Sequence, residues 1–240
     1  MISSLRIKLG YLCQNDIPVF ITKFLYGKLI NEGPFKGMQY INKASCSAIA
    51  PKILGTYEIE IQPIIQELIK SESYQQIVNI GAADGYYAVG LATQKKNCPI
   101  IAYEASHKAR ELLQQLSEVN HVSETLSIKG ICDKKSLDGK IKPNTFFLID
   151  IEGFESELFE DKLVSQLADS TLLIETHTFQ GESTQKLLSR KFQKTHQISL
   201  ISRQKRPVKS FPSKRFISRY LQNEHRRDPN NAWIFLTPKQ

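Results

Sequence analysis

Short apolar runs alternate with amphipathic segments along most of the 240-residue chain. The apolar runs are residues 76–81, 100–103, 124–129, 146–149, 171–174, 196–202 and 232–236. Between the runs, apolar residues return at helical spacing, as at Ala88, Leu91 and Ala92 after the first run. Such alternation predicts an α/β fold built on a doubly wound, mostly parallel sheet of seven strands. Only a basic irregular stretch separates the last two runs, which favours an antiparallel pair at the edge of the sheet.

Capping residues and one proline place the predicted helices. One helix spans about residues 84–95, and the next follows Ser106, whose side chain suits an N-cap. The apolar stripe of that second helix consists of Ala109, Leu112, Leu113 and Leu116. A further helix spans about 181–192. Ahead of the first strand, a helix begins near Pro63 or carries this proline in its first turn.

Residues 1–55 precede this alternation and are predicted to form an accessory segment, followed by a domain at residues 56–240. A short amphipathic helix near 16–30 would carry Val19, Phe20 and Phe24 at helical spacing. Residues 5–9 mix apolar and basic side chains, which is compatible with a strand, a helix or a membrane-surface contact. The polar residues 55–58 would either close over a ligand or cap the helix that follows.

The formal net charge is +8, and the positive charge is concentrated near the C-terminal end. Basic residues cluster between positions 190 and 227, where only Glu224 opposes them, and a basic insertion is predicted at about 203–230. A cluster of this kind suggests an anionic partner, such as nucleic acid, an acidic substrate or a membrane surface. A solubilising surface is the alternative.

Composition favours a cytoplasmic protein with reduced thiols. No apolar run approaches the roughly 20 residues of a membrane span, and the N-terminal residues lack the pattern of a secretory signal. The cysteines at positions 13, 46, 98 and 132 are scattered, which indicates neither a zinc site nor a disulfide framework. The chain also lacks a Gly-x-Ser-x-Gly elbow, a Walker-type lysine loop and a His-Glu-x-x-His helix, which argues against common hydrolases, nucleoside triphosphatases and zinc proteases.

The stretch of residues 77–87 is the centre of the pattern, because it reads as a buried strand, a glycine turn and a helix start. Gly81 and Gly85 allow the backbone to turn sharply and to approach a ligand, and Ala82 keeps the turn small. A strand that enters a helix N-terminus through such a turn is typical of nucleotide-type binding elements. An ordinary strand-to-helix turn with glycines for tight packing remains the alternative.

Glu104 ends the second predicted strand, about 23 residues after Gly81. An acid at this spacing can accept hydrogen bonds from both ribose hydroxyls of a nucleoside-bearing cofactor. This spacing favours a ribose contact over a surface glutamate.

Four polar side chains follow two predicted strands, Asp150 and Glu152 after the fourth and Glu175 and His177 after the fifth. In extended backbone the members of each pair share a face, and if the two strands are adjacent all four groups meet at the carboxyl edge, where Gly153 allows a turn. His177 has the intrinsic pKa of a base near neutral pH. The oxygens of Asp150, Glu152 and Glu175 would also suit magnesium or calcium. Helix capping and pairing with arginines is the third interpretation.

Three segments resemble class I S-adenosylmethionine-dependent methyltransferases, specifically the FkbM-like group. Residues 78–87 resemble the cofactor loop, and Tyr103-Glu104 resembles the ribose-binding strand end. Residues 148–155, with the sequence LIDIEGFE, resemble the Asp-x-Glu-Gly segment of the group. The resemblance covers about residues 56–200 and implies a Rossmann-like sheet. Asn79 departs from it, because an acid often stands two residues before the first glycine.

The resemblance implies that the cofactor is S-adenosylmethionine and that the methyl group goes to an oxygen of a sugar or other small hydroxylated molecule. The basic segment is compatible with an anionic acceptor. The resemblance implies cofactor contacts from Asn79, Gly81, Ala82, Asp84, Gly85, Tyr86, Glu104, Asp133 and Asp150. Asp133 would receive the adenine amino group. Asp150, Glu152 and His177 would position the acceptor and remove its proton, with His177 as the base, and Glu175 would also contact the substrate. A divalent metal at Asp150, Glu152 and Glu175 is compatible with this site but not expected.

Two alternatives stay open. The first keeps methyl transfer but takes RNA as the acceptor, because Phe211, Phe216 and Tyr220 are interleaved with the basic residues and can stack on bases. The chain lacks the Asn/Asp-Pro-Pro-Tyr/Phe segment of many amino-directed base methyltransferases, which weakens this alternative. The second is a non-catalytic cofactor-binding or assembly module that docks an acidic partner or a membrane.

Overall fold

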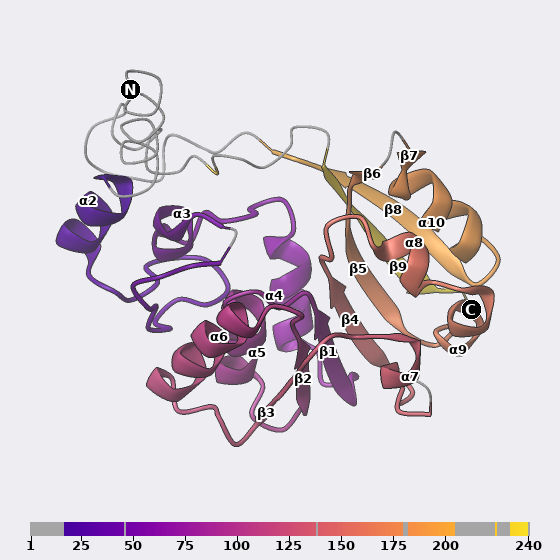
Figure 1. The fold of residues 1–240 in the computed structure, drawn as a ribbon, viewed down its shortest axis with the longest axis horizontal. Helices are drawn as coiled ribbons and strands as arrows, with labels where there is room; N and C mark the ends of the chain where they lie inside the picture. The colour runs from indigo at the N-terminus through magenta and orange to yellow at the C-terminus, as the bar shows by residue number, and fades with distance from the viewer. Residues whose placement is uncertain are drawn as a thin grey trace.

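The computed structural model describes residues 17–45, 47–137, 139–179, 182–204, 224 and 231–239. Its centre is a seven-stranded sheet with the order β3-β2-β1-β4-β5-β9-β8 (Figure 1). The strands are β1 Gln76–Ile80, β2 Ile100–Tyr103, β3 Leu126–Lys129, β4 Thr145–Ile149, β5 Thr171–Thr176, β8 His196–Ser202 and β9 Ala232–Pro238. The strands β1 to β5 are parallel, and β9 runs antiparallel between β5 and β8. The predicted sheet and its antiparallel edge pair are therefore confirmed.

Helices cover both faces of this sheet (Figure 1). One face carries α4 Gln62–Lys70, α5 Tyr86–Gln94 and α6 His107–Val119. The other carries α7 Lys134–Leu137, α8 Glu155–Leu158, α9 Asp161–Gln166 and α10 Thr184–Phe192. Pro63 lies in the first turn of α4, and the Ser106 side chain caps α6, as predicted. A short ribbon of β6 Thr178–Phe179 and β7 Glu182–Ser183 follows β5.

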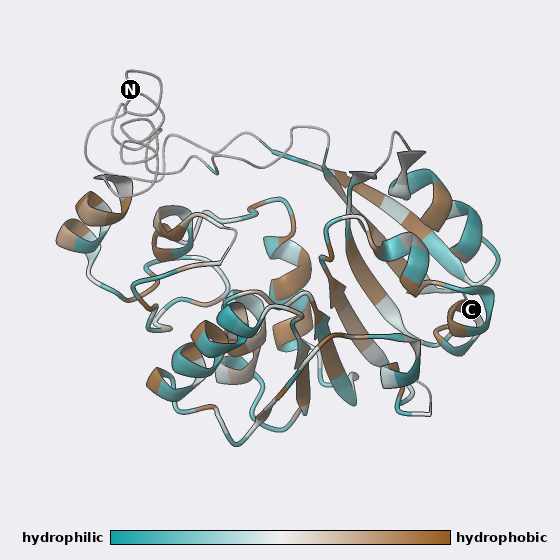
Figure 2. Ribbon diagram, viewed as in Figure 1, coloured by the Kyte–Doolittle hydropathy of each residue, from teal (hydrophilic) through white to brown (hydrophobic). Residues whose placement is uncertain are grey.

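Alternate residues of the central strands build two separate cores, because successive side chains point to opposite faces of a sheet. Ile77 and Phe146 pack with α4, α5 and α6, whereas Val78 and Phe147 pack against the opposite helices. The central strands are apolar on both faces (Figure 2), which explains why their sequences read as continuous apolar runs.

The segment before residue 56 shares the first of these cores. The helix α3 Ile49–Leu54 and the loop before it contribute Phe35, Tyr40 and Ile53, all of which are buried. The fit is close, since a Cβ on Gly90 of α5 would lie 2.5 Å from the Phe35 ring. The division of the chain at residue 55 stays a prediction, but the two parts are packed together.

The helix α2 Ile17–Tyr26 confirms the predicted N-terminal helix, but its apolar residues do not form one face. Val19 packs on the core, while Phe20 and Phe24 are 72% and 80% exposed. Across the part of the chain that the structure describes, no helix is long and apolar enough to cross a bilayer.

Several sequence predictions concern residues outside the described ranges. These are residues 5–9, the cysteines at positions 13 and 46, and most of the basic insertion at about 203–230, including Phe211, Phe216 and Tyr220.

Candidate active site

A cavity of about 1030 Å³ opens at the carboxyl ends of β1, β2 and β4. The order of the sheet explains its position, because the chain builds outward from β1 through β2 to β3 and then returns to β4 on the other side of β1. Open α/β sheets bind ligands at such a switch point. The lining includes the glycine turn, Glu104, Asp133, Asp150 and Trp233.

The glycine turn is packed directly against the end of β4. Gly81 has φ 78° and Gly85 has φ 91°, a region that favours glycine. A Cβ on Gly81 would lie 1.7 Å from the carbonyl oxygen of Asp150, and one on Gly85 would lie 2.2 Å from the Leu113 side chain. The glycines therefore serve tight packing, and they also bring the loop and Asp150 to the same wall of the cavity.

Glu104 lies where the sequence predicts it, at the end of β2 and beside the glycine turn. One carboxylate oxygen accepts a hydrogen bond from the Ala83 N–H at 2.7 Å, and the other accepts one from the Ser106 N–H at 2.7 Å. A carboxylate oxygen can accept a second hydrogen bond, so the side chain is fixed in place and still able to accept from a ligand.

Asn79 presents a buried acceptor at the cavity wall. Its side chain is 3% exposed, and its Nδ2 donates to the Leu148 carbonyl at 3.1 Å. Its Oδ1 has no hydrogen-bond partner among the described residues. A buried acceptor without a donor is costly, and a ligand donor in the cavity would satisfy it.

Asp133 lies at the exposed rim of the cavity. Its carboxylate accepts hydrogen bonds from the Ser136 hydroxyl at 2.6 Å and the Ser136 N–H at 2.8 Å. These bonds lower its pKa and hold the carboxylate ionised. Asp133 is therefore fixed as an acceptor at the cavity edge.

Asp84 accepts hydrogen bonds from three residues of the segment before residue 56. The sequence did not predict these contacts. The Asp84 carboxylate accepts hydrogen bonds from Lys52 Nζ at 2.8 Å, from the Tyr40 hydroxyl at 2.5 Å and from the Ser45 N–H at 3.3 Å. Lys52 and Asp84 are 2% and 1% exposed. We call this buried pair the Lys52–Asp84 clamp, because it fixes the N-terminal segment to the glycine turn.

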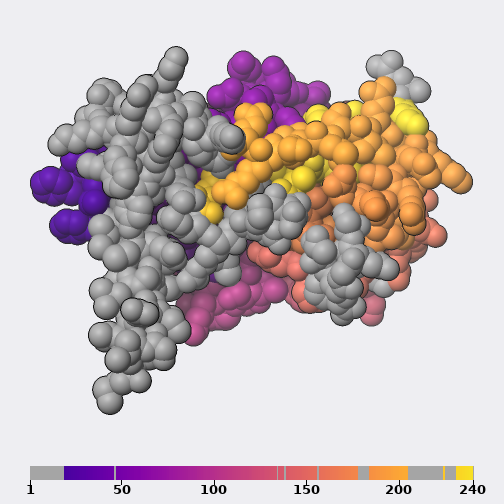
Figure 3. Space-filling model, turned by 90° about the horizontal axis from the view of Figure 1, so that it is seen from above, coloured from indigo at the N-terminus to yellow at the C-terminus, as the bar shows by residue number. Residues whose placement is uncertain are grey.

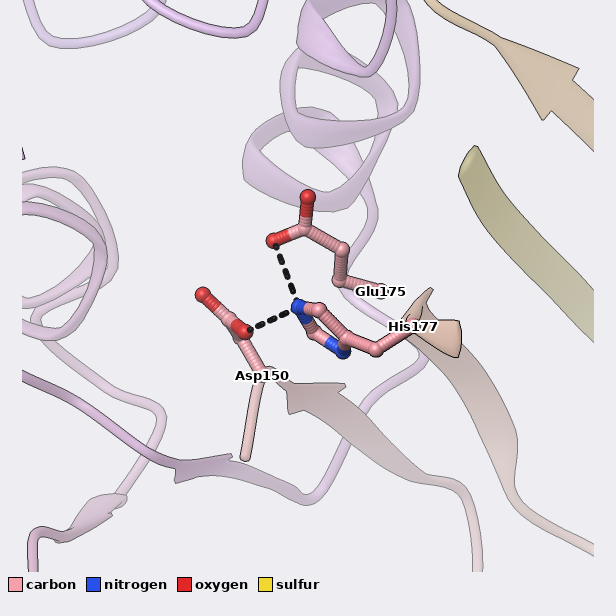
Figure 4. Close-up of side chains that lie close together, drawn as sticks. All are labelled: Asp150, Glu175 and His177. Carbon is pink, nitrogen blue, oxygen red and sulfur yellow. Dashed lines mark ion pairs between the residues drawn. The ribbon is translucent and has the colours of Figure 1, made fainter. Parts of the chain in front are cut away.

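Asp150, Glu152, Glu175 and His177 meet at the adjacent ends of β4 and β5, as predicted. Figure 4 shows three of them, Asp150, Glu175 and His177. His177 Nε2 lies 3.6 Å from Asp150 Oδ1, 3.6 Å from Glu152 Oε2 and 3.9 Å from Glu175 Oε2. The prediction that Asp150 and Glu152 share a face of extended backbone was wrong. Asp150 follows the end of β4 and Glu152 has φ 54°, so the backbone forms a turn at this point. The turn returns Glu152 toward His177.

Glu155 completes this cluster from the start of α8, and sequence reasoning missed this role. It is fully buried, and its Oε1 lies 3.2 Å from His177 Nδ1 and accepts from the Gly153 N–H at 3.3 Å. From the sequence, Glu155 was expected within the segment 148–155 and in the first turn of the helix that follows. Its contact with His177, 22 residues later, has no local signal in the sequence.

The cluster holds protons more tightly than isolated side chains would. Burial, followed by the charges of Glu175, Glu58 and Glu152, raises the pKa of Asp150 well above its usual value. For His177, burial alone would lower the pKa, but the hydrogen bond with Glu155 and the neighbouring carboxylates outweigh burial and raise it. Both shifts favour protonation toward neutral pH.

Glu58 brings the predicted polar loop into the cavity wall, and it too was not predicted as a site residue. Glu58 is 2% exposed and accepts a short hydrogen bond from the Tyr87 hydroxyl. Its backbone N–H donates to Glu224 Oε1 at 2.9 Å. The loop is therefore held from both sides.

Within the described residues, one group has the geometry of a metal site. Asp150, Glu175 and His177 each offer a ligand atom, and these atoms lie within 4.8 Å of one another. The sequence suggested Glu152 as the third ligand, but this group contains His177 in its place. The Glu152 side chain is 75% exposed.

No protein-family model matches the chain, and no curated protein matches it. The chain is similar in structure to a putative O-methyltransferase from Klebsiella pneumoniae, with a TM-score of 0.50 and 10% identity over 76% of this chain and 79% of that one. It is also similar to the human methyltransferase 10 domain containing protein, with a TM-score of 0.53 and 13% identity over 91% and 96% of the two chains. The delta-N METTL16 methyltransferase domain gives a TM-score of 0.53 and 13% identity over 92% and 96%. The fold is therefore the Rossmann-like fold of class I methyltransferases.

Proposed function

We propose that this chain of class I methyltransferase fold is an S-adenosylmethionine-dependent methyltransferase that methylates a hydroxyl group of a sugar or another small hydroxylated molecule. One observation carries the proposal. The glycine turn at Gly81 is in contact with the Asp150 backbone, so a cofactor on the turn would lie directly beside the Asp150–His177 cluster. The more specific FkbM-like assignment rests on the segments 78–87, 103–104 and 148–155 and stays a prediction.

The cavity offers the groups that such a cofactor needs. The unpartnered Asn79 Oδ1 suits the ammonium group of the methionine end, Glu104 suits the ribose hydroxyls, and Asp133 suits the adenine amino group. Gly81, Ala82, Gly85 and Tyr86 would form the backbone turn around the methionine end. The Asp84 carboxylate is engaged by Lys52, so we propose that Asp84 contributes by holding this turn.

When bound, the cofactor supplies a methyl group on a sulfonium, an excellent leaving group. Transfer to an acceptor hydroxyl would break the C–S bond, form a C–O bond and release the hydroxyl proton. Asp150 lines the cavity and its Oδ1 lies 3.6 Å from His177 Nε2. This pair would take up the proton, with His177 as the base. Alignment of the acceptor can supply about 7–11 kcal/mol, and a base about 100- to 10,000-fold in rate.

Cofactor binding is the first test. Trp233 is the single tryptophan of the chain, is 1% exposed and lines the cavity. Titration with S-adenosylhomocysteine should therefore change its fluorescence. Replacement of Glu104 by Ala should weaken this binding about 10- to 100-fold, because a charge-assisted hydrogen bond contributes about 1.5–3 kcal/mol. Glu111→Ala, an exposed change on α6, is the matched control. A wild-type protein that shows no binding at millimolar ligand would exclude the proposed function.

Catalysis is tested separately from binding. The variants Asp150→Asn and His177→Ala should bind S-adenosylhomocysteine and lose about 100-fold or more in the rate of methyl transfer to a hydroxylated acceptor. Full activity in both variants would remove the cluster from the mechanism.

A metal-assisted form of the reaction is the second candidate, and the ligand geometry of Asp150, Glu175 and His177 favours it. The Glu155 contact at Nδ1 leaves Nε2 of His177 directed at the two carboxylates, an arrangement that metal-binding histidines share. We expect dialysis against EDTA to leave activity unchanged. Loss of activity that added Mg²⁺ or Mn²⁺ restores would establish the metal-assisted form.

RNA as the acceptor rests on the basic residues 190–227, most of which lie outside the described ranges. The test is a binding titration with a short single-stranded RNA at two salt concentrations. Tight, salt-sensitive binding together with methylated RNA would replace the small-molecule proposal.

A further inference from the structure

Exposed apolar side chains gather at one place on the molecule. Four large hydrophobic residues within ten positions are exposed, namely Phe20 at 72%, Phe24 at 80%, Leu25 at 54% and Leu29 at 54%. We call these four the α2 patch. Elsewhere in the described ranges, exposed large hydrophobic residues are scattered, as at Ile131 and Leu200.

The fold does not require the apolar residues of this patch. The inner side of α2 is made by Val19, Thr22 and Tyr26, which lie at helical spacing and face the rest of the protein. Phe20 and Phe24 lie on another side of the helix, where their rings stack with 6.5 Å between the ring centroids. A surface helix of a globular protein carries polar residues on that side. Two exposed phenylalanines there indicate a contact with something outside the fold.

Positive charge accompanies the patch. Between residues 19 and 45 the lysines are Lys23, Lys28, Lys36 and Lys43, and the only acid is Glu32. Lys23 Nζ donates to the Asn42 side chain at 3.1 Å, which places the lysine beside residue 43. Burial and then the charge of Lys28 lower the pKa of Lys23. Lys23 and Lys28 thus lie within the same stretch, residues 20–29, as the four exposed apolar residues.

The position of α2 also suits a contact with a broad surface. The helix lies at one end of the molecule in the ribbon view (Figure 1), and its indigo atoms form the left edge of the space-filling view (Figure 3). The candidate active site is formed at the ends of β1, β2 and β4, and no residue of α2 lines its cavity. A contact through α2 would therefore not involve the residues of the candidate active site.

We propose that the α2 patch docks the protein on an anionic lipid surface. Phenylalanine and leucine side chains enter the boundary between headgroups and acyl chains, and the lysines contact the negative headgroups. The combination of stacked aromatic residues with the net positive charge of residues 19–45 fits this partner better than a second copy of the chain, whose identical lysines would repel each other.

The test is co-sedimentation of the full chain with phosphatidylcholine vesicles that contain or lack phosphatidylglycerol. The wild-type protein should bind the anionic vesicles, bind the neutral vesicles much less and lose binding as salt is raised. Phe20→Ser/Phe24→Ser should weaken binding by about tenfold or more, and Lys28→Gln/Lys43→Gln should weaken it on anionic vesicles only. Leu200→Ser, which removes an exposed apolar side chain elsewhere, should leave vesicle binding unchanged.

Three results would overturn the proposal. The first is vesicle binding that Phe20→Ser/Phe24→Ser leaves unchanged, since lysines alone would then explain it. The second is a concentration-dependent dimer that this variant abolishes while vesicles fail to bind. The third is binding of a single-stranded RNA that depends on the two phenylalanines in the absence of vesicle binding. Thermal unfolding of the variant at the wild-type temperature shows that it is folded, and because this readout needs no cofactor it keeps the test separate from the proposed function.

Discussion

At the scale of single residues, the most informative contact is the one between Glu155 and His177. Glu155 is fully buried and holds Nδ1, so it fixes the imidazole with Nε2 directed at Asp150 and Glu175. A histidine oriented in this way is ready to exchange a proton at a defined atom. Glu155 is therefore a positioning residue whose charge also sets the pKa of the ring.

The variant Glu155→Gln tests this role through pH. Burial lowers the pKa of His177, and Glu155 is among the groups that raise it, so removal of the Glu155 charge should lower it. Proton transfer in the variant should then begin at lower pH than in the wild type. The measurement is an NMR titration of the His177 ring together with the pH profile of the rate.

The same substitution has a stability consequence. Because the folded-state pKa of His177 is raised, its contribution is fully present below about pH 6.5 and is lost as the pH rises through the folded value. Glu155→Gln should therefore destabilise the protein more at pH 6 than at pH 9, by roughly 1.5 kcal/mol. Equal losses at both pH values would show that the contact with His177 is not the cause.

Gly81 offers a second residue-scale prediction. In Gly81→Ala, the new Cβ meets the Asp150 carbonyl at 1.7 Å, so the turn or the end of β4 must move. We expect a loss of about 3 kcal/mol or more in unfolding free energy together with loss of cofactor binding. Gly37→Ala, at φ 89° with open space around the Cβ, is the control and should cost only about 1–2 kcal/mol. Urea unfolding measures both variants.

At the scale of elements, the Lys52–Asp84 clamp joins α3 to the glycine turn before α5. Lys52→Met would leave the Asp84 charge buried without its cation, which typically costs about 3–5 kcal/mol. The double variant Lys52→Met/Asp84→Asn should recover part of that loss, because it removes both charges. A single variant as stable as the wild type would show that water or another cation compensates for the loss.

The strands and helices were predictable from the sequence because the formation of each depends on residues that are close together in the chain. Residues 146–149 are apolar on both faces and were predicted as a buried strand, and the Ser106 cap was predicted from its own position. The approach of Asp150 to His177 was predictable too, since two parallel neighbours end at one edge of the sheet.

The remaining site contacts depend on partners far apart in the chain. Asp84 pairs with Lys52 across 32 residues, and His177 pairs with Glu155 across 22, and neither distance leaves a periodic signal. A lysine within an apolar stretch and a glutamate at a helix start both suggest ordinary surface positions. Only the packing of the segment before residue 56 into the core reveals that Lys52 is buried.

At the scale of the whole molecule, the acidic cluster weakens the fold that contains it. Because burial and the carboxylates around Asp150 raise its pKa, the folded protein holds more protons than the unfolded chain, and stability falls as the pH rises from about 4 through the folded value. Asp150→Asn removes this charge and should stabilise the protein by about 0.5–2 kcal/mol at neutral pH. Thermal unfolding with and without the substitution, repeated near pH 4, measures the difference, which should vanish at the lower pH.

The placement of β9 has a consequence for the lifetime of individual amide protons. Although β9 lies close to the end of the chain, where fraying is usual, it is hydrogen-bonded along both sides, to β5 and to β8. Its amide protons should consequently exchange with deuterium as slowly as those of β1 and β4, while those of the edge strand β3 exchange sooner. Opening of β9 would separate Trp233 from Glu175 and thereby expose one wall of the cavity. The slowest-exchanging region of the protein should therefore include its last strand.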